Sequence, residues 1–302
     1  MPRVNSFQTG FVAVIGRPNV GKSTLINTLM QQKVSIVSPK PQTTRNSINC
    51  ILMGENYQII LVDTPGIHKP KNKLGEYMMK SARDTMANVD CVLWAADLST
   101  GLRPEDNEII KTLKATKTPI VIALNKKDLA SPKQKEQLTH AIQGELGKQT
   151  FVETSGKTGY GTEALISALL KHIPEGPMLY PEDYLTDQPE RFVVSEMIRE
   201  KAILQLQDEI PYGIGVEIVR MTDREDKPIT DIEANILCER ESHKGIVIGK
   251  KGATLKKIGI SAREDIEALL GTQVNLKLWV KVREDWRNNR AAMRSLGYKL
   301  EK

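Results

Sequence analysis

A glycine-rich stretch near the beginning of the chain constrains the fold more than any other feature. Residues 16–23 read Gly-Arg-Pro-Asn-Val-Gly-Lys-Ser, which fits the phosphate-binding pattern of Gly, four residues and then Gly-Lys-Ser. The run 10–15 before it is typical of a buried strand, and the run 23–30 after it is typical of a helix. We expect this loop to bind phosphate groups, because the N–H groups at a helix N-terminus favour anions. The expected binding residues are Gly16, Arg17, Pro18, Asn19, Val20, Gly21, Lys22, Ser23 and Thr24.

Strand-like and helix-like segments alternate up to about residue 173. This alternation predicts an α/β fold with a doubly wound, mostly parallel sheet and a site at the carboxyl ends of the strands. The first hairpin is expected where 48–53 joins 58–62 through a Gly-Glu-Asn turn. The expected strands are Phe11–Ile15, Ile48–Met53, Gln58–Val62, Cys91–Ala95, Pro119–Leu124 and Thr150–Glu153, and the expected helices are 23–30, 74–87, 104–115 and 161–172.

A short acidic motif follows the strand at 58–62. An aspartate in this position can hold Mg²⁺, and the following glycine N–H can bond an oxygen of a γ-phosphate. In the phosphate-binding loop, Lys22 would reach the β- and γ-phosphates and the Ser23 hydroxyl would bind Mg²⁺. The residues expected at the nucleotide from the acidic motif are Asp63, Thr64, Pro65, Gly66 and Ile67.

A second polar motif follows the strand at 119–124 and selects the base. Guanine presents its N1–H and its N2 amine as adjacent donors, and the Asp128 carboxylate can accept both. Adenine offers no such pair, so a buried carboxylate would lose its hydrogen bonds. Asn125 can brace the loop, and the Lys126 stem can lie over the base. The residues expected at the base are Asn125, Lys126, Lys127, Asp128, Ser155, Gly156 and Lys157.

These motifs, in this order, resemble the Era group within the translation-factor-like GTPases over the whole first domain. The resemblance implies GTP and GDP as nucleotides, and it implies that the second threonine of Thr43-Thr44-Arg45 coordinates Mg²⁺. Thr44 would then complete the metal site with Ser23 and Asp63, and Thr43 is the alternative. The expected catalytic residues are Lys22, Thr44 and Gly66.

Ile67 follows the acidic motif where many small GTPases have a glutamine that orients water. An isoleucine neither donates nor accepts a hydrogen bond, so we expect slow intrinsic hydrolysis. The resemblance also implies that Asn19 helps to hold K⁺ beside the phosphates, where the ion would supply the charge of an arginine finger.

The composition changes after residue 173. A proline- and acid-rich segment, 174–190, separates a GTPase domain at 1–173 from a second domain at 191–302. Residues 191–243 carry 7 Lys or Arg against 12 Asp or Glu, whereas residues 244–302 carry 14 against 6. The basic stretch predicts a surface for an anion, most often a nucleic acid, and a solvated basic face is the plain alternative.

The second domain is predicted as helix, strand, strand, helix, Gly-x-x-Gly loop, helix and strand. The expected helices are 192–208, 242–248 and 253–270, and the expected strands are 213–223, 230–239 and 274–282. This order resembles an α+β KH domain of the second topological type, whose Gly-x-x-Gly loop lets a single-stranded backbone approach closely. The residues expected at RNA are Gly249, Lys250, Lys251, Gly252 and Lys256.

The final segment, 283–298, is predicted as one amphipathic helix. Its arginines recur at helical spacing, and Arg283, Arg287 and Arg290 are expected to contact RNA. A capping helix with a solvated side is the equal alternative, and contact with an anionic membrane is a further one.

The combined resemblance covers nearly the whole chain. It implies a monomeric GTPase that binds small-subunit ribosomal RNA near its 3′ end and assists assembly of the 30S-type particle and rRNA maturation. We expect it in the cytoplasm, with peripheral contact to the inner membrane as an option, because no apolar run approaches the ~18 residues of a membrane span. A non-enzymatic RNA chaperone with GTP as a structural ligand is one alternative, and a GTPase of tRNA modification is another.

Overall fold

The computed structural model describes residues 7–38, 40, 43–67, 70 and 72–298. The chain divides into two compact units, and the main boundary falls between Asp187 and Gln188. Part of the expected loop at 38–45, namely residues 39, 41 and 42, lies outside the described residues. No helix in the described ranges is long and apolar enough to cross a membrane.

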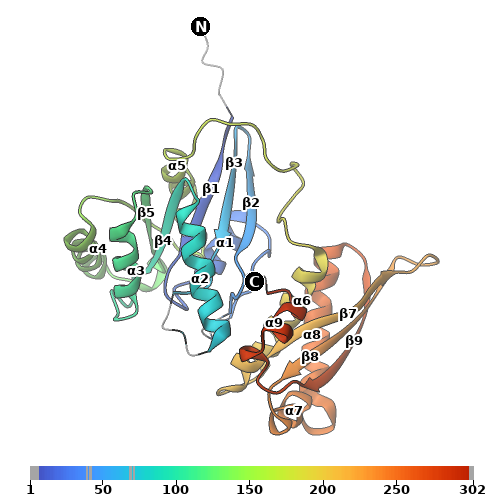
Figure 1. Cartoon of the computed structure of the whole chain (residues 1–302). Coiled ribbons are helices and arrows are strands. Elements are labelled where there is room, and N and C mark those ends of the chain that lie inside the picture. The colour runs from blue at the N-terminus through green and yellow to red at the C-terminus, as the bar shows by residue number, and fades with distance from the viewer. Residues whose placement is uncertain (1–6, 39, 41–42, 68–69, 71, 299–302) are drawn as a thin grey trace. The chain divides into compact units, whose positions relative to one another are not determined.

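The first unit is built on a six-stranded sheet in the order β2-β3-β1-β4-β5-β6 (Figure 1). Only β2 runs antiparallel to its neighbour, so the remaining strands direct their carboxyl ends to one edge. The prediction of a doubly wound, mostly parallel sheet is therefore confirmed. The strands are β1 (Gln8–Ile15), β2 (Ile48–Gly54), β3 (Tyr57–Asp63), β4 (Cys91–Asp97), β5 (Ile120–Asn125) and β6 (Thr150–Glu153).

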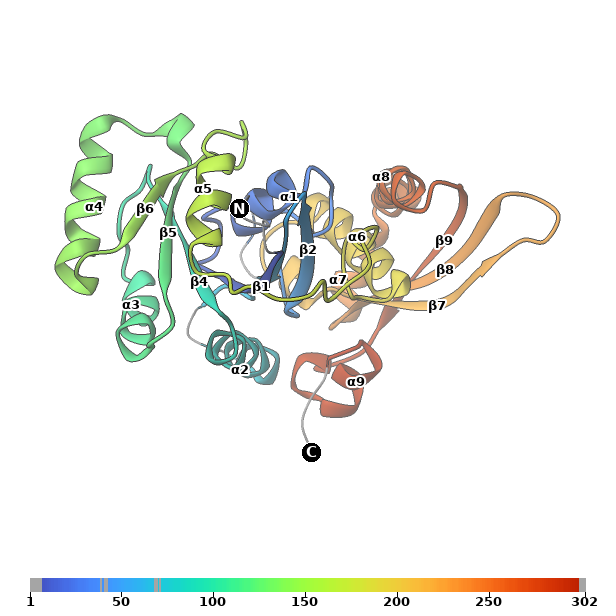
Figure 2. The same ribbon diagram turned by 90° about the horizontal axis from the view of Figure 1, so that it is seen from above.

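Helices cover both faces of this sheet, as a parallel sheet requires. Figure 2 shows α2 (Lys73–Ala87) and α3 (Asp106–Ala115) on one side, and α1 (Lys22–Met30) and α5 (Thr162–Leu170) on the other. The side chains of α2 and α3 share one apolar core with β4, β5 and α4 (Pro132–Leu146). Trp94 on β4 is fully buried in this core. The packed sheet thus fixes the strand ends from which the polar motifs project.

The segment after α5, residues 174–187, packs along the first unit, and we call it the strap. The Ile51 N–H on β2 donates to the Leu185 carbonyl at 2.9 Å. The fully buried Gln58 on β3 holds the strap by its amide: its Oε1 accepts from Leu179 N and Tyr180 N, and its Nε2 donates to Tyr180 O. These hydrogen bonds tie most of the expected linker to the β2–β3 hairpin.

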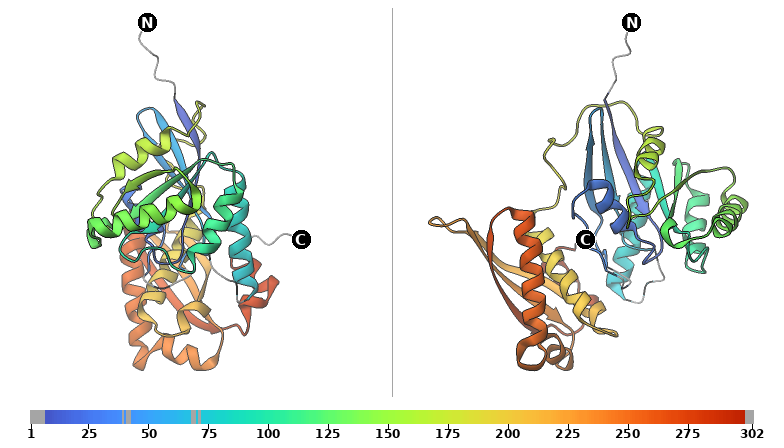
Figure 3. Two further views of the ribbon diagram at one scale, coloured as in Figure 1. Left: turned by 90° about the vertical axis from the view of Figure 1, so that its left-hand side faces the viewer. Right: turned by 180° about the vertical axis from the view of Figure 1, so that it is seen from behind.

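The second unit packs helices on one face of a three-stranded sheet in the order β7-β8-β9. Strands β7 and β8 are antiparallel, and β8 and β9 are parallel. The first and last long helices of the unit, α6 and α8, lie side by side against the sheet (Figure 3). The elements are α6 (Glu190–Gln205), β7 (Gly215–Asp223), β8 (Ile229–Cys238), α7 (Glu241–Ile248), α8 (Ala253–Leu270), β9 (Gln273–Val282) and α9 (Arg290–Ser295). This order is the one predicted for a type II KH domain, which is confirmed.

The expected continuous helix at 283–298 is wrong. A short 3₁₀ turn, Trp286–Asn288, is followed by the six-residue α9, and Asn289 between them is extended. The Asn289 side chain accepts hydrogen bonds from the backbone N–H groups of Ala291 and Ala292, so it starts a new helix instead of continuing an old one. The arginines of the tail therefore do not share one helical face.

Candidate nucleotide site and RNA groove

The phosphate-binding loop joins β1 to α1, as the sequence predicts. Gly21 has a φ of 94°, and a side chain there would come within 2.6 Å of the Asn125 amide nitrogen, so only glycine fits. The Lys22 ammonium lies inside the loop and donates to the carbonyls of Gly16 and Arg17 at 3.0 and 3.2 Å. Burial lowers the pKa of Lys22 to about 8, although the Asp63 carboxylate acts in the opposite direction.

Three oxygen-bearing side chains from separate elements meet beside this lysine. The Ser23 hydroxyl donates to Asp63 Oδ2 at 2.9 Å, and the Thr44 hydroxyl reaches the same oxygen at 3.2 Å. Asp63 is fully buried, and its other oxygen, Oδ1, has no hydrogen-bond partner. Burial raises the pKa of Asp63, and Lys22 and the hydroxyl groups oppose that rise. A set made only of oxygens, with one buried carboxylate oxygen left over, fits Mg²⁺. The structure thus places Thr44 at the expected site.

The rest of the acidic motif packs against the sheet and the phosphate-binding loop. Thr64 is fully buried and donates its hydroxyl hydrogen to the Val14 carbonyl at 2.7 Å. Gly66 lies so close to Pro18 that an added side chain would come within 3.2 Å of it. The side chain of Ile67 is 1% exposed and belongs to the apolar core under α2 and α3. It therefore offers water neither a polar group nor a surface.

Asn125 braces three loops at the base end of the site. Its Nδ2 donates to the Val20 carbonyl at 2.8 Å, and its Oδ1 accepts from the Gly156 N–H at 3.0 Å. The Ser155 hydroxyl donates to Asp128 Oδ1 at 2.6 Å and so holds an exposed carboxylate in place. The contribution of Ser155 is thus a side-chain hydrogen bond as well as the expected backbone groups.

The other residues expected at the nucleotide lie around these loops. Lys127 pairs with Glu153 at 2.5 Å, and Lys157 is exposed. Asn19 is exposed at the tip of the phosphate-binding loop with a φ of 65°. Their contacts with a nucleotide stay predictions.

Two aspartates that the motifs did not single out lie beside the phosphate-binding loop. The Arg17 guanidinium contacts Asp106 at 3.2 Å and Asp97 at 3.6 Å, and it donates to the Thr100 hydroxyl. Asp97 ends β4, and Asp106 begins α3. The rule that picked out Asp63 and Asn125, a polar residue at a strand's carboxyl end, also applies to Asp97.

The second unit has a groove beside its Gly-x-x-Gly loop. Gly249 and Gly252 have φ values of 75° and 77°, and Lys250 and Lys251 between them are exposed. The groove has a volume of about 420 Å³ and includes the exposed Ile260. From α8 it is lined by Gly252, Leu255, Lys256, Gly259, Ile260 and Arg263, and from β9 by Val274, Asn275, Leu276 and Leu278. An apolar floor with lysines at one end suits bases and phosphates.

Two of the three tail arginines expected at RNA are engaged within the unit. Arg287 pairs with Glu239 through two hydrogen bonds, and Arg283 donates to the Ser295 hydroxyl at 2.8 Å. Trp286 is fully buried and donates to the Gly213 carbonyl. Arg290 begins α9 and is exposed. The tail therefore closes the unit, and its RNA contacts stay predictions.

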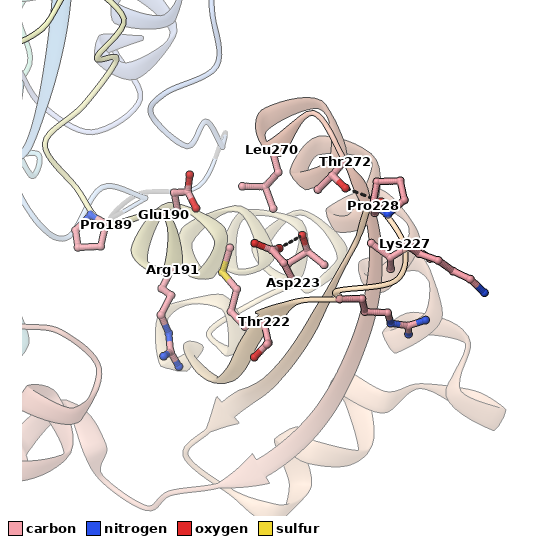
Figure 4. A pocket seen from close by; sticks show the side chains of 13 residues that line it. Pro189, Glu190, Arg191, Thr222, Asp223, Lys227, Pro228, Leu270 and Thr272 are labelled. Carbon is pink, nitrogen blue, oxygen red and sulfur yellow. Dashed lines mark hydrogen bonds between the residues drawn. The ribbon is translucent and has the colours of Figure 1, made fainter.

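A larger hollow of about 650 Å³ lies elsewhere in the second unit, between the start of α6 and the β7–β8 hairpin (Figure 4). Within it the Thr230 hydroxyl donates to Asp223 Oδ1 at 2.6 Å. Its charged side chains, which include Glu190, Arg191 and Lys227, are of both signs. This mixture does not match the uniform positive charge that a phosphate backbone favours.

Comparison with known proteins accounts for both units. Residues 11–126 match the family described as 50S ribosome-binding GTPase, and residues 209–287 match the KH domain family. The chain is 52% identical over 297 residues to GTPase Era of Caldicellulosiruptor saccharolyticus, covering 98% of this chain and 99% of the relative. It is 50% identical over 295 residues to GTPase Era of Clostridioides difficile, covering 97% and 99%.

Two solved structures are similar over nearly the full length. One is Era in complex with MgGDPNP and nucleotides 1506–1542 of 16S ribosomal RNA, with a TM-score of 0.94, 39% identity and coverage of 97% of this chain and 100% of the other. The other is a variant of Aquifex aeolicus Era bound to GDP and AlF₄⁻, with a TM-score of 0.93, 38% identity and the same coverage.

Proposed function

The chain belongs to the Era family of GTPases, and from this premise we propose that it hydrolyses GTP and binds small-subunit ribosomal RNA near its 3′ end. In this role it assists assembly of the small ribosomal subunit and maturation of its RNA. The observation that carries the proposal is the meeting of Ser23, Thr44 and Asp63 beside the buried Lys22. The lysine-flanked groove of the KH unit supports its RNA-binding half.

The reaction is attack of water on the γ-phosphate of GTP, which gives GDP and phosphate. The backbone N–H groups of the phosphate-binding loop and Lys22 bind the phosphates, and the Gly66 N–H bonds the γ-phosphate. Ser23, Thr44 and Asp63 would hold Mg²⁺, which would supply positive charge to the bound phosphates. The Asp128 carboxylate accepts from guanine, and the Ser155 hydroxyl holds that carboxylate in place.

Potassium is the cation that we propose beside the phosphates. The buried Ile67 offers no group to position water, so an additional positive charge compensates for part of the missing stabilisation. Asn19 stands exposed in the phosphate-binding loop, where its amide oxygen can ligate K⁺. Hydrolysis should then be slow in Na⁺ and several-fold faster in K⁺. Asn19→Ala should abolish this ratio, and a ratio that survives the substitution would exclude the role of Asn19.

The RNA half of the proposal is tested by binding. The protein is loaded with a non-hydrolysable GTP analogue or with GDP, and its affinity is measured at fixed salt. The probes are single-stranded RNA matching the 3′ end of the small-subunit rRNA and a scrambled RNA. Tighter, sequence-selective binding in the GTP state is expected. Equal affinity for both RNAs would remove the rRNA assignment, and equal affinity in both nucleotide states would remove the coupling.

GTP turnover that rises with RNA or small subunits would distinguish this function from an RNA chaperone that holds GTP as a structural ligand. The full-length relatives do not favour tRNA modification.

We place the protein in the cytoplasm as a monomer that acts on a 30S-type particle. Its peripheral contact with the inner membrane stays a prediction.

A further inference from the structure

The carboxylate of Asp97 lies between the two loops that would hold opposite ends of a nucleotide. Its side chain is almost fully buried, and one oxygen, Oδ1, accepts from the Ser99 N–H at 3.0 Å and from the Ser99 hydroxyl at 2.6 Å. Burial raises the pKa of Asp97, but hydrogen bonds from Lys126 and Ser99 and the charge of Arg17 outweigh burial and lower it. The carboxylate is therefore ionised at neutral pH.

The second oxygen, Oδ2, faces both loops. Lys126 of the base-recognition loop donates to it at 2.8 Å, and Arg17 of the phosphate-binding loop approaches it at 3.6 Å. Lys126 has a φ of 64°, so its backbone is held in a left-handed conformation at the end of β5. With both its backbone and its ammonium group fixed, the four-carbon stem has little freedom left. The stem is thus positioned before a base arrives.

Arg17 is held from more than one side. Its Nε contacts Asp106 Oδ2 at 3.2 Å, and a terminal nitrogen donates to the Thr100 hydroxyl. Asp106 also accepts from the Arg103 N–H at 2.9 Å, and no interaction joins it to Lys126. Of these two aspartates, Asp97 therefore contacts both Lys126 and Arg17, whereas Asp106 contacts Arg17 and not Lys126.

We propose that Asp97 is a positioning residue that couples guanine recognition to phosphate binding, through Lys126 on one side and Arg17 on the other. The inference rests on the proposed binding of guanine nucleotides at this site. Asp97 touches neither base nor phosphate in this scheme. One oxygen of Asp97 positions both the Lys126 stem, which would lie over the base, and Arg17 in the phosphate-binding loop. A change that loosens either loop therefore loosens the other.

The test is the dissociation rate of a fluorescent GDP from the full-length protein with Mg²⁺ present. Asp97→Asn keeps an oxygen for Ser99 but turns an amide towards the two cations, and Lys126→Met keeps an apolar stem without its charge. Each change should speed GDP release about tenfold. The double variant should release GDP no more than about twofold faster than the faster single variant, because both changes break the same link.

Asp106→Asn is the matched control, because it affects Arg17 without touching Lys126. Its effect should multiply with that of Lys126→Met. If the effects of Asp97→Asn and Lys126→Met also multiply, or if Asp97→Asn leaves release unchanged, the coupling role is wrong. A simple structural defect would speed release in every background and would not give this contrast.

A milder variant keeps the test valid if Asp97→Asn fails to fold. Ser99→Ala removes one hydrogen bond to Asp97 and no charge, so it should speed release about threefold, and it should not add to Lys126→Met. Thermal melting of each nucleotide-free variant checks folding. Failure of the wild-type protein to bind GDP would refute the proposed function, whereas GDP binding with multiplicative effects would refute the coupling alone.

Discussion

At the scale of the residue, the phosphate site combines a buried ammonium with a buried carboxylate. Neither Lys22 nor Asp63 is more than 7% exposed. Burial lowers the pKa of Lys22 and raises the pKa of Asp63, because it disfavours the charged form of each group. The phosphates of a bound nucleoside triphosphate would bring negative charge to Lys22. The site is thus arranged for its ligand at some cost to the free protein.

This cost predicts a pH dependence of stability. The pKa of Lys22 is about 8 in the folded protein against 10.5 ordinarily, so between these values the unfolded chain binds more protons. The unfolding free energy of the nucleotide-free protein should rise across this range, with a contribution from Lys22 of up to about 1.4 kcal/mol per pH unit. Lys22→Met removes that contribution. Its stability advantage over wild type should be greatest below pH 8 and shrink towards pH 10.5.

Denaturant unfolding at a series of pH values measures this difference. Lys157→Met, which removes an exposed lysine near the base loops, is the matched control, and its profile should run parallel to that of the wild type. A constant difference between Lys22→Met and wild type from pH 7 to pH 10.5 would contradict the buried-lysine account.

At the scale of the element, strand ends explain what the sequence predicted and what it missed. Asp63 and Asn125 were found because each follows a clear apolar run. Asp97 was missed because the apolar run of β4 was expected to end at Ala95, whereas the strand extends to Asp97. A local sequence pattern cannot reveal that the Asp97 carboxylate contacts both Arg17 and Lys126. That contact depends on the pairing of β4 with β5.

Helices were predictable where they bury a continuous stripe. Helix α4 was missed because only Leu138 and Ile142 are buried along its 15 residues, so no apolar stripe marks it. The tail was wrongly predicted as one helix because arginine spacing suggested a periodicity that Asn289 interrupts. In both cases tertiary packing or a single capping side chain decided the outcome, and the periodicity of the sequence did not.

The two lysines of the Gly-x-x-Gly loop predict how RNA affinity depends on salt concentration. Lys250 and Lys251 are exposed beside the groove, so each can neutralise a phosphate and release counterions. Replacing both with alanine should weaken RNA binding for all sequences. It should also reduce the slope of log affinity against log salt by about 1.4, since each contact with a single strand contributes about 0.7.

Fluorescence anisotropy with a labelled RNA from 50 to about 300 mM salt gives the slope. Lys227→Ala is the control, because this lysine lies at the mixed-charge hollow of the hairpin and not at the groove. Its slope should equal that of wild type. An unchanged slope in the double variant would show that Lys250 and Lys251 do not contact the RNA phosphates.

At the scale of the whole molecule, the fully buried Gln58 fastens the strap to the first unit. Gln58→Leu keeps the side chain's size and removes three hydrogen bonds to Leu179 and Tyr180. Each is worth about 1 kcal/mol, so local opening of the strap should become at least tenfold more frequent. Hydrogen exchange at the backbone amides of residues 179–186 and limited proteolysis measure this opening.

Gln8→Leu is the control, because the side-chain hydrogen bonds of Gln8 go to Leu170 and Ile173 and not to the strap. Unchanged exchange in Gln58→Leu would show that Gln58 does not hold the strap.

The strap also lies along the free edge of β2, one of the two outer strands of the six-stranded sheet. A strand in that position displays N–H and C=O groups that invite pairing with a second polypeptide. Here the Ile51 N–H donates to the Leu185 carbonyl, and Cys50 pairs with Thr186 in an isolated antiparallel bridge. The strap thus covers part of the β2 edge, where a second polypeptide could otherwise pair. Concentrated protein with an unfastened strap should form β-rich aggregates at temperatures where the wild type stays dispersed.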